Sequence, residues 1–423
     1  MDASHLGAAG DGPGLTHLRL GKDVGEASSA VVDEETQVAE RTVGREQVLR
    51  HRFRRQQLDR APGAGRKVTS IDLLDIGVQD TGADGAGWAL VLRGAPLESL
   101  SASSDELALA WTLRGAPHAY RRADLAEVAV ATAPWSDDDA AKRIFDASTR
   151  LRKTDREILD ALREVADAER ELARKPIVKG DLSHALNSHL GEEFLRWCNP
   201  CQATHIYEQP FRLSALQAGL ELEPGTSPPV LKRAPKLRPN LYRHLAGEAP
   251  ERHQVVRGTL RFFGPLTVKE VTEFLDAAQK DVKAHWPDDV VEVEVSGVAG
   301  TRFLLADDLD DLDAAADAPA AAGVVVRLVG SHDAFLQARD RAVLVPNAAH
   351  RKALLPVIGR PGGVVADGQL VGLWRPKTSG RRFTLRLTPW GRMTKARRAA
   401  VEVEAERLAA FRGLELAGIT DER

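Results

Sequence analysis

Cysteine is nearly absent from this sequence, with only Cys198 and Cys201 among 423 residues. A small secreted domain held together by disulfides is therefore excluded, and a chain of this length can bury a sufficient core without them. Long apolar runs are lacking too, since none approaches the roughly 18 residues that cross a bilayer. The first residues have neither a basic start nor an apolar stretch, so they predict no signal peptide. We expect a cytoplasmic protein without membrane contact.

Phosphate-binding and nucleophile motifs are also missing. The sequence contains no Walker-type Gly-rich loop and no Gly-x-Ser-x-Gly motif, so neither nucleotide hydrolysis nor serine-hydrolase chemistry is predicted. Cys198, Cys201 and His205 provide part of a zinc ligand set, which His184 or His189 could complete. A pair of reduced thiols is the interpretation we prefer. We therefore predict no metal ion and no other cofactor.

Charge is distributed unevenly along the chain. The net charge is only -3. Residues 341–412, however, contain fifteen basic and four acidic residues, a net charge of +11, and an acidic run at 307–317 contributes to the balance. A basic segment of this kind suits a polyanion such as DNA. The alternative is a solvated, Arg-rich surface.

Residues 251–306 have the order of a winged helix, with three helices followed by two strands. Thr267 and Glu270 have capping-box spacing and should start the second helix. The other expected elements are helices at 253–263 and 277–286 and strands at 290–295 and 301–305. In this fold the third helix enters the major groove, where Lys280 and Lys283 would face DNA. A winged helix used for protein contacts is the alternative.

Two upstream regions, 45–135 and 136–250, repeat this order less clearly. In the first we expect helices at 45–58, 70–76 and 85–92 and a basic hairpin formed by 107–113 and 119–122. In the second we expect a capping box at Thr154 and Glu157, helices at 181–189 and 192–197, and a strand at 205–207. Proline-rich residues 223–240 and residues 307–322 are predicted linkers. Residues 1–44 are predicted to be a disordered extension.

The C-terminal region, 323–423, changes to short β-rich runs. They lie at 324–329, 363–365, 369–374 and 383–387, with a hairpin turn at Asp367-Gly368 and a last helix at 395–412. This pattern favours a small barrel or sheet. The predicted fold is thus α+β, with three tandem winged-helix units followed by a small C-terminal β-barrel.

Four segments resemble a known family. They are LLDIGVQDTGADGAGWAL (73–90), WTLRGAPHAYRRADL (111–125), FLRWCNPCQATHIYEQPFR (194–212) and the run from Arg339 to Pro376. Together they resemble the AlkZ-like winged-helix family of bacterial DNA glycosylases, which act on alkylated and crosslinked bases. The resemblance spans about 45–412. It implies a monomer that binds double-stranded DNA in the nucleoid.

The resemblance places the catalytic motif at Gly77-Val78-Gln79-Asp80-Thr81. Catalytic family members have Gln-x-Gln or Gln-x-Asp here, and these two side chains hold the attacking water. Gln79 fits the first position, whereas Thr81 stands where Gln or Asp is expected. Asp80 could orient water if the segment is irregular. Alternatively, Asp80 or Thr81 caps the following helix.

The expected DNA contacts follow from the same resemblance and from the basic segments. Arg114 and His118 match the family's Arg-Gly-Thr-Leu-His hairpin, which would press into DNA near the target, although a plain phosphate contact is the alternative for His118. The other expected contacts, besides Lys280 and Lys283, are Arg121, Arg122, Arg375, Lys377, Arg381, Arg382, Arg397 and Arg398. The sequence therefore predicts a duplex-DNA-binding protein, and the resemblance implies a monofunctional glycosylase for alkylated bases. The alternatives are a non-catalytic regulator or damage sensor and a protein-binding scaffold.

Overall fold

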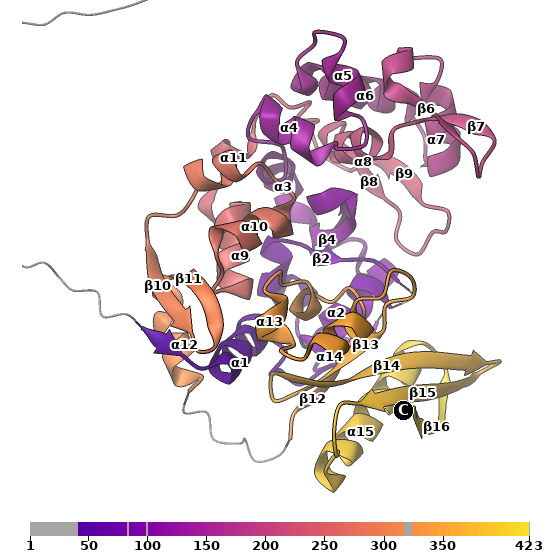
Figure 1. Cartoon of the computed structure of the whole chain (residues 1–423). Helices are drawn as coiled ribbons and strands as arrows, with labels where there is room; N and C mark the ends of the chain where they lie inside the picture. The colour runs from indigo at the N-terminus through magenta and orange to yellow at the C-terminus, as the bar shows by residue number, and fades with distance from the viewer. Residues whose placement is uncertain (1–40, 83, 99, 317–323, 423) are drawn as a thin grey trace, which may run out of the picture. The chain divides into compact units, whose positions relative to one another are not determined.

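Three helices and a hairpin occupy residues 255–305 in the computed structural model, which describes residues 41–82, 84–98, 100–316 and 324–422 (Figure 1). The elements are α9 (Val255–Phe263), α10 (Val268–Leu275), α11 (Gln279–Ala284), β10 (Val290–Val295) and β11 (Val298–Leu305). The capping box is confirmed: the Thr267 hydroxyl accepts from the Glu270 amide at 3.2 Å, and the Glu270 carboxylate accepts from the Thr267 amide at 2.9 Å. The order of elements expected from the sequence is present.

The N-terminal prediction falls mostly outside the described residues, which begin at 41. Of the stretch expected to be disordered, Thr42–Val43 forms β1, which pairs in parallel with β10. The helix expected at 45–58 is α1 (Arg45–Arg55), and the one expected at 85–92 is α2 (Gly85–Leu92). Residues 70–76, expected to be helical, instead form two 3-10 turns at Val68–Ser70 and Asp72–Asp75. The segment is too short for a regular helix before Gly77, whose φ of 86° ends it.

The second region departs further from the expected order. An unpredicted helix, α3 (Leu125–Ala131), ends the first region, and the helices of the second are α4 (Asp137–Arg143), α5 (Ser148–Arg152), α6 (Ile158–Leu172), α7 (Lys179–Leu186) and α8 (Glu208–Gln217). No capping box forms before α6, because the Thr154 hydroxyl donates to the Leu151 carbonyl and Glu157 makes no side-chain cap. The prediction of a helix at 192–197 is also wrong. After a 3-10 turn at Glu192–Phe194, strands β6 (Leu195–Cys198) and β7 (Ala203–Ile206) form a hairpin.

A six-stranded sheet crosses the boundary expected between the first two regions. Its strand order is β2-β4-β3-β8-β9-β5. The strands are β2 (Val78–Gln79), β3 (Leu107–Trp111), β4 (Pro117–Arg121), β5 (Ile177–Val178), β8 (Leu220–Leu222) and β9 (Val230–Arg233). β3 and β4 form the expected hairpin. β9 lies within the predicted linker 223–240, which is therefore part of the sheet: the prolines flank a short strand near the sheet edge, where they leave its pairing intact.

The C-terminal region forms an open five-stranded sheet. Its order is β12 (Val326–Val329), β13 (Gly362–Ala366), β14 (Gln369–Ser379), β15 (Arg382–Pro389) and β16 (Glu415–Asp421). Among the described residues β12 and β16 are not paired, so the expected closed barrel is not found. The remaining helices are α12 (Leu309–Ala314), which lies in the second predicted linker, α13 (Arg341–Leu344), α14 (Ala348–Leu354) and α15 (Lys395–Phe411). The Asp367-Gly368 turn is confirmed, and the Thr394 hydroxyl caps α15 by accepting from the Arg397 amide.

Helix α2 joins the two main hydrophobic cores. Ala86, Ala89 and Leu90 pack in the core built on the six-stranded sheet, whereas Trp88 and Val91 pack in the core of the C-terminal sheet. The Trp88 indole donates to the Leu328 carbonyl at 2.7 Å, which ties α2 to β12. The start of α2 therefore lies where residues 77–118 meet residues 328–341. No helix in the described part of the chain has the length and apolarity to span a membrane.

Candidate active site

The Gln79-Asp80-Thr81 motif lies between strand β2 and helix α2. In extended chain, alternate side chains share a face. Accordingly, Gln79 and Thr81 meet, and the Gln79 amide donates to the Thr81 hydroxyl at 3.0 Å. The Gln79 carbonyl oxygen faces Arg114, whose guanidinium donates to it at 3.4 Å. These two contacts fix the orientation of the Gln79 side-chain amide, with Nε2 as the donor and Oε1 as the acceptor.

Asp80 turns the other way and caps α2. Its carboxylate accepts from the Ala86 amide at 2.8 Å, and burial raises its pKa above the ordinary value. Gly85 makes this contact possible, since a Cβ at residue 85 would lie 1.9 Å from the Asp80 carboxylate oxygen. The capping alternative thus describes Asp80, which does not line the recess beside Gln79.

A small recess opens beside Gln79 and Thr81. It measures about 40 Å³, and its lining includes Asp84, Ser331 and His332. A water molecule needs roughly 10–15 Å³ of such volume and two to four polar partners. Both requirements are met here, whereas a nucleobase is too large. The recess can therefore hold a water molecule between the motif and the loop after β12.

His118 lies inside the protein rather than at a hairpin tip. It is only 3% exposed, and burial lowers its pKa to about 3, so the imidazole is neutral. Its Nδ1 lies 2.9 Å from the Ala116 carbonyl and 3.0 Å from the Thr112 hydroxyl, which in turn contacts Tyr120 at 2.8 Å. The imidazole therefore lies in the interior in this structure, and its contact with DNA stays a prediction. It helps to line a second small recess together with Gln79 and Arg114.

Arg114 lines this second recess. Three further arginines lie within electrostatic reach of Arg114 or of one another, and the four are called here the arginine cluster: Arg114, Arg339, Arg341 and Arg360. Burial and the neighbouring guanidinium groups lower the pKa of Arg114 and of Arg341 to about 10. Arg114 also donates to the Phe274 carbonyl at 2.6 Å and lies over the Phe274 ring. The cluster gives the site a positive potential that attracts phosphate groups.

His332 reaches the site from the C-terminal sheet. It lines both recesses, and its Nδ1 lies 3.0 Å from the Ser331 hydroxyl. Burial lowers its pKa. The adjacent Asp333 makes a bidentate pair with Arg93, the residue that follows α2, with both N–O distances 2.9 Å and both side chains almost fully buried. This pair anchors the His332 loop to α2.

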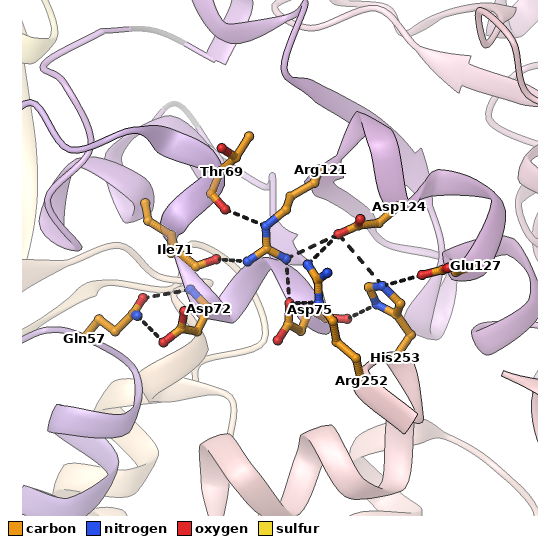
Figure 2. Close-up of polar contacts among 10 residues, drawn as sticks. All are labelled: Gln57, Thr69, Ile71, Asp72, Asp75, Arg121, Asp124, Glu127, Arg252 and His253. Carbon is orange, nitrogen blue, oxygen red and sulfur yellow. Dashed lines mark hydrogen bonds and ion pairs between the residues drawn. The ribbon is translucent and has the colours of Figure 1, made fainter. Parts of the chain in front are cut away.

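Arg121 and Arg122 bind the protein itself. Figure 2 shows the Arg121 guanidinium enclosed by the carbonyls of Thr69 and Ile71 and the carboxylates of Asp75 and Asp124. Arg122 donates to Glu221 and to backbone carbonyls of 104 and 107. Their donors are engaged within the protein, and their contact with DNA stays a prediction.

The other predicted DNA contacts lie on several surfaces. Lys280 and Lys283 are exposed on α11, with no ion pair among the described residues. Arg375 donates to the Gly359 carbonyl at 2.6 Å, and Arg398 pairs with Asp421. Arg397 is partly exposed near the start of α15. Exposed at the end of the β14–β15 hairpin, which extends from the C-terminal sheet in Figure 1, are Lys377, Arg381 and Arg382.

Sequence reasoning missed His332 and Arg339 as site residues. Both follow the buried strand β12 but lie roughly 250 residues beyond Gln79 in the chain. The one available signal was a polar run, Gly330-Ser331-His332-Asp333, at a strand end. Nothing in the sequence placed that strand end against α2.

The fold and site together define a mixed α+β protein with a cationic, water-sized site where two cores meet. The family model described as "DNA glycosylase AlkZ-like" matches residues 75–411. The chain therefore belongs to the AlkZ-like DNA glycosylase family, which supports a role in binding DNA. The solved structure of the Streptomyces sahachiroi DNA glycosylase AlkZ is similar in fold, with TM-score 0.63 and 19% identity over 90% of this chain and all of that chain. No curated protein sequence matches.

Proposed function

We propose that this protein is a DNA glycosylase that hydrolyses the N-glycosidic bond of alkylated bases in duplex DNA. The observation that carries the proposal is the Gln79–Thr81 pair at a recess large enough for water, directly beside the arginine cluster. Gln79 and Thr81 can orient a water molecule but cannot deprotonate it strongly, and the Asp84 carboxylate at the recess is paired with Arg412. This chemistry suits a leaving group that departs readily by itself.

An alkylated purine is such a leaving group, because it takes the electron pair of the breaking bond and departs as a neutral base. The sugar then develops oxocarbenium character and needs only a positioned water. We infer that the Gln79 carbonyl oxygen, oriented by Arg114, accepts one hydrogen bond from this water, and that the Thr81 hydroxyl holds it from the other side. The proton passes to solvent after attack. Asp80 acts indirectly by fixing α2.

The wider surface supports duplex DNA as the substrate. The loop before β13 exposes Val357 and Ile358, which are 100% and 88% accessible, next to Arg360. Apolar side chains of this kind, beside cations, can wedge between base steps. Lys377 and Arg382 on the β14–β15 hairpin could contact phosphates. We further propose that residues 255–305 act as a winged helix and that the protein binds DNA as a monomer in the nucleoid.

A second candidate is a non-catalytic DNA-binding protein, such as a regulator or a damage sensor. One observation favours it. Thr81 provides a hydroxyl where catalytic family members have a carboxamide or a carboxylate, and Asp80 is already committed to the helix cap. In that case the protein would have kept the DNA-binding surface and lost the chemistry.

The test is single-turnover release of N7-methylguanine from duplex DNA. We expect release by the wild type and a fall of roughly 10²-fold or more in Gln79→Ala, since positioned polar groups contribute about this much. Gln47→Ala is the matched control, because this amide donates to the Leu312 carbonyl away from the site. No release by the wild type, together with DNA binding that falls steeply with salt, would replace the proposal by the second candidate.

A further inference from the structure

The β6–β7 hairpin brings together two thiols and an imidazole. Arg196 pairs with His205 and Cys198 pairs with Ala203, so Cys198 and His205 stand on the same face of the hairpin. Cys201 lies in the turn between the strands. One donor atom from each of Cys198, Cys201 and His205 lies within 4.8 Å of the other two.

These donors and distances fit a zinc ion. Zinc binds thiolate sulfur at about 2.3 Å and imidazole nitrogen at about 2.0–2.1 Å, so donors on one tetrahedral ion lie roughly 3.5–3.8 Å apart. A closure of about 1 Å, within the reach of side-chain torsions, would therefore complete the triad. A Cys-x-x-Cys turn with a nearby histidine is a usual zinc ligand spacing, and both cysteines are free of a disulfide.

A second observation points to a ligand at the same place. The Nε2 atom of His205 is buried but has no hydrogen-bond partner among the described residues. A buried polar nitrogen without a partner costs free energy unless something else satisfies it. The hairpin is also held in place, because the Asn187 side chain donates to the Thr204 carbonyl at 2.8 Å. The histidine is thus positioned and one nitrogen is unsatisfied.

We propose that Cys198, Cys201 and His205 bind one Zn²⁺ ion. Binding releases the two thiol protons to solvent, and the two thiolates balance the charge of the ion. No fourth Cys, His, Asp or Glu atom joins the group among the described residues, so a water molecule completes the tetrahedron. The ion would fix the hairpin end that exposes Trp197, which is 58% accessible. The site is separate from the Gln79 recess and does not depend on the proposed function.

The experiment measures the metal content of the full-length protein, purified without chelator. We expect one zinc per chain in the wild type and at least a tenfold loss of zinc in Cys201→Ser and in His205→Ala. His244→Ala, which changes an exposed histidine paired with Glu248, is the matched control and should retain zinc. Zinc contents at background in the wild type, or equal in all four proteins, would overturn the proposal.

Cobalt binding by the wild type gives a test that does not depend on the folding of a variant. The apoprotein titrated with Co²⁺ alone should develop the intense visible bands of a tetrahedral site and a thiolate-to-cobalt charge-transfer band. A weak octahedral spectrum without charge transfer would refute the site, as would a Cys198–Cys201 disulfide in freshly purified protein. None of these outcomes depends on base release, so failure of this proposal and failure of the glycosylase proposal are distinguishable.

Discussion

The Arg93–Asp333 pair should couple the two cores of the protein. Asp333→Ala leaves the Arg93 guanidinium buried, with the Ala89 carbonyl as its main remaining acceptor. Breaking a buried pair in this way costs about 3–5 kcal/mol, because one charge stays desolvated without compensation. Arg93→Met combined with Asp333→Leu removes both charges, and we expect it to cost less than Asp333→Ala alone. The exposed Arg398–Asp421 pair should contribute at most about 1 kcal/mol.

Urea unfolding of the single and double variants measures this coupling. Far-UV circular dichroism follows the whole chain, and tryptophan fluorescence includes Trp88, which lies on α2 close to Arg93. We also expect slower base release from Asp333→Ala, since the neighbouring His332 would lose its anchor. The reasoning would be refuted if Asp333→Ala unfolded at the wild-type urea concentration. It would equally fail if the double variant lost as much stability as Asp333→Ala alone.

Three further predictions concern buried or surface groups. Glu169 is fully buried and its pKa is raised well above 4.5, so the folded chain retains a proton that the unfolded chain releases. The free energy of unfolding should therefore fall by up to about 1.4 kcal/mol per pH unit as the pH rises from 4.5 to the folded-state pKa of Glu169. Glu169→Gln should flatten this pH dependence in urea titrations at several pH values, and an unchanged slope would count against the prediction. Gly85→Ala should destabilise the protein by more than about 1 kcal/mol because of the clash with Asp80 and the positive φ of 45°. Asp80→Ala should relieve part of this loss, so the effects of the two substitutions on thermal unfolding should not add; full additivity would contradict the contact. Arg121→Met should lower stability without changing the salt dependence of DNA binding, because this guanidinium binds the protein itself. Lys377→Ala should leave stability unchanged and reduce the slope of log K against log salt by about 0.9, because we expect this lysine to contact a phosphate. The opposite pattern in fluorescence anisotropy would refute these two roles.

Local signals in the sequence were reliable wherever neighbouring residues decide the structure. The capping box at Thr267 formed because both partners lie within one helical turn. The alternating run at 290–295 became β10 with the same bounds, since its pattern fits a half-buried strand. The same spacing failed at Thr154 and Glu157. There the Leu159 amide donates to Asp137, so a distant side chain serves the start of α6 in place of the local box.

The open C-terminal sheet shows a different limit. Short apolar runs predicted its strands, but closure depends on whether the edge strands can pair, which the runs themselves do not specify. Strand β16 was missed, and it pairs in parallel with β15 as an edge of the sheet. The predicted linker 223–240 failed for a similar reason, because β9 gains its stability from β5 and β8 rather than from its own residues.

The sequence by itself determined the family, several of the helices, the basic C-terminal region and Gln79 with its variant partner Thr81. These depend on motifs and on periodicity, which neighbouring residues encode. Only the tertiary structure decided the functions of the charged side chains. It buried His118, engaged the Arg121 guanidinium with carboxylates and carbonyls of the protein, turned Asp80 toward α2, and brought His332 to Gln79. Burial and long-range pairing determine whether a cation faces solvent or a carboxylate, and both arise from contacts between segments far apart in the chain.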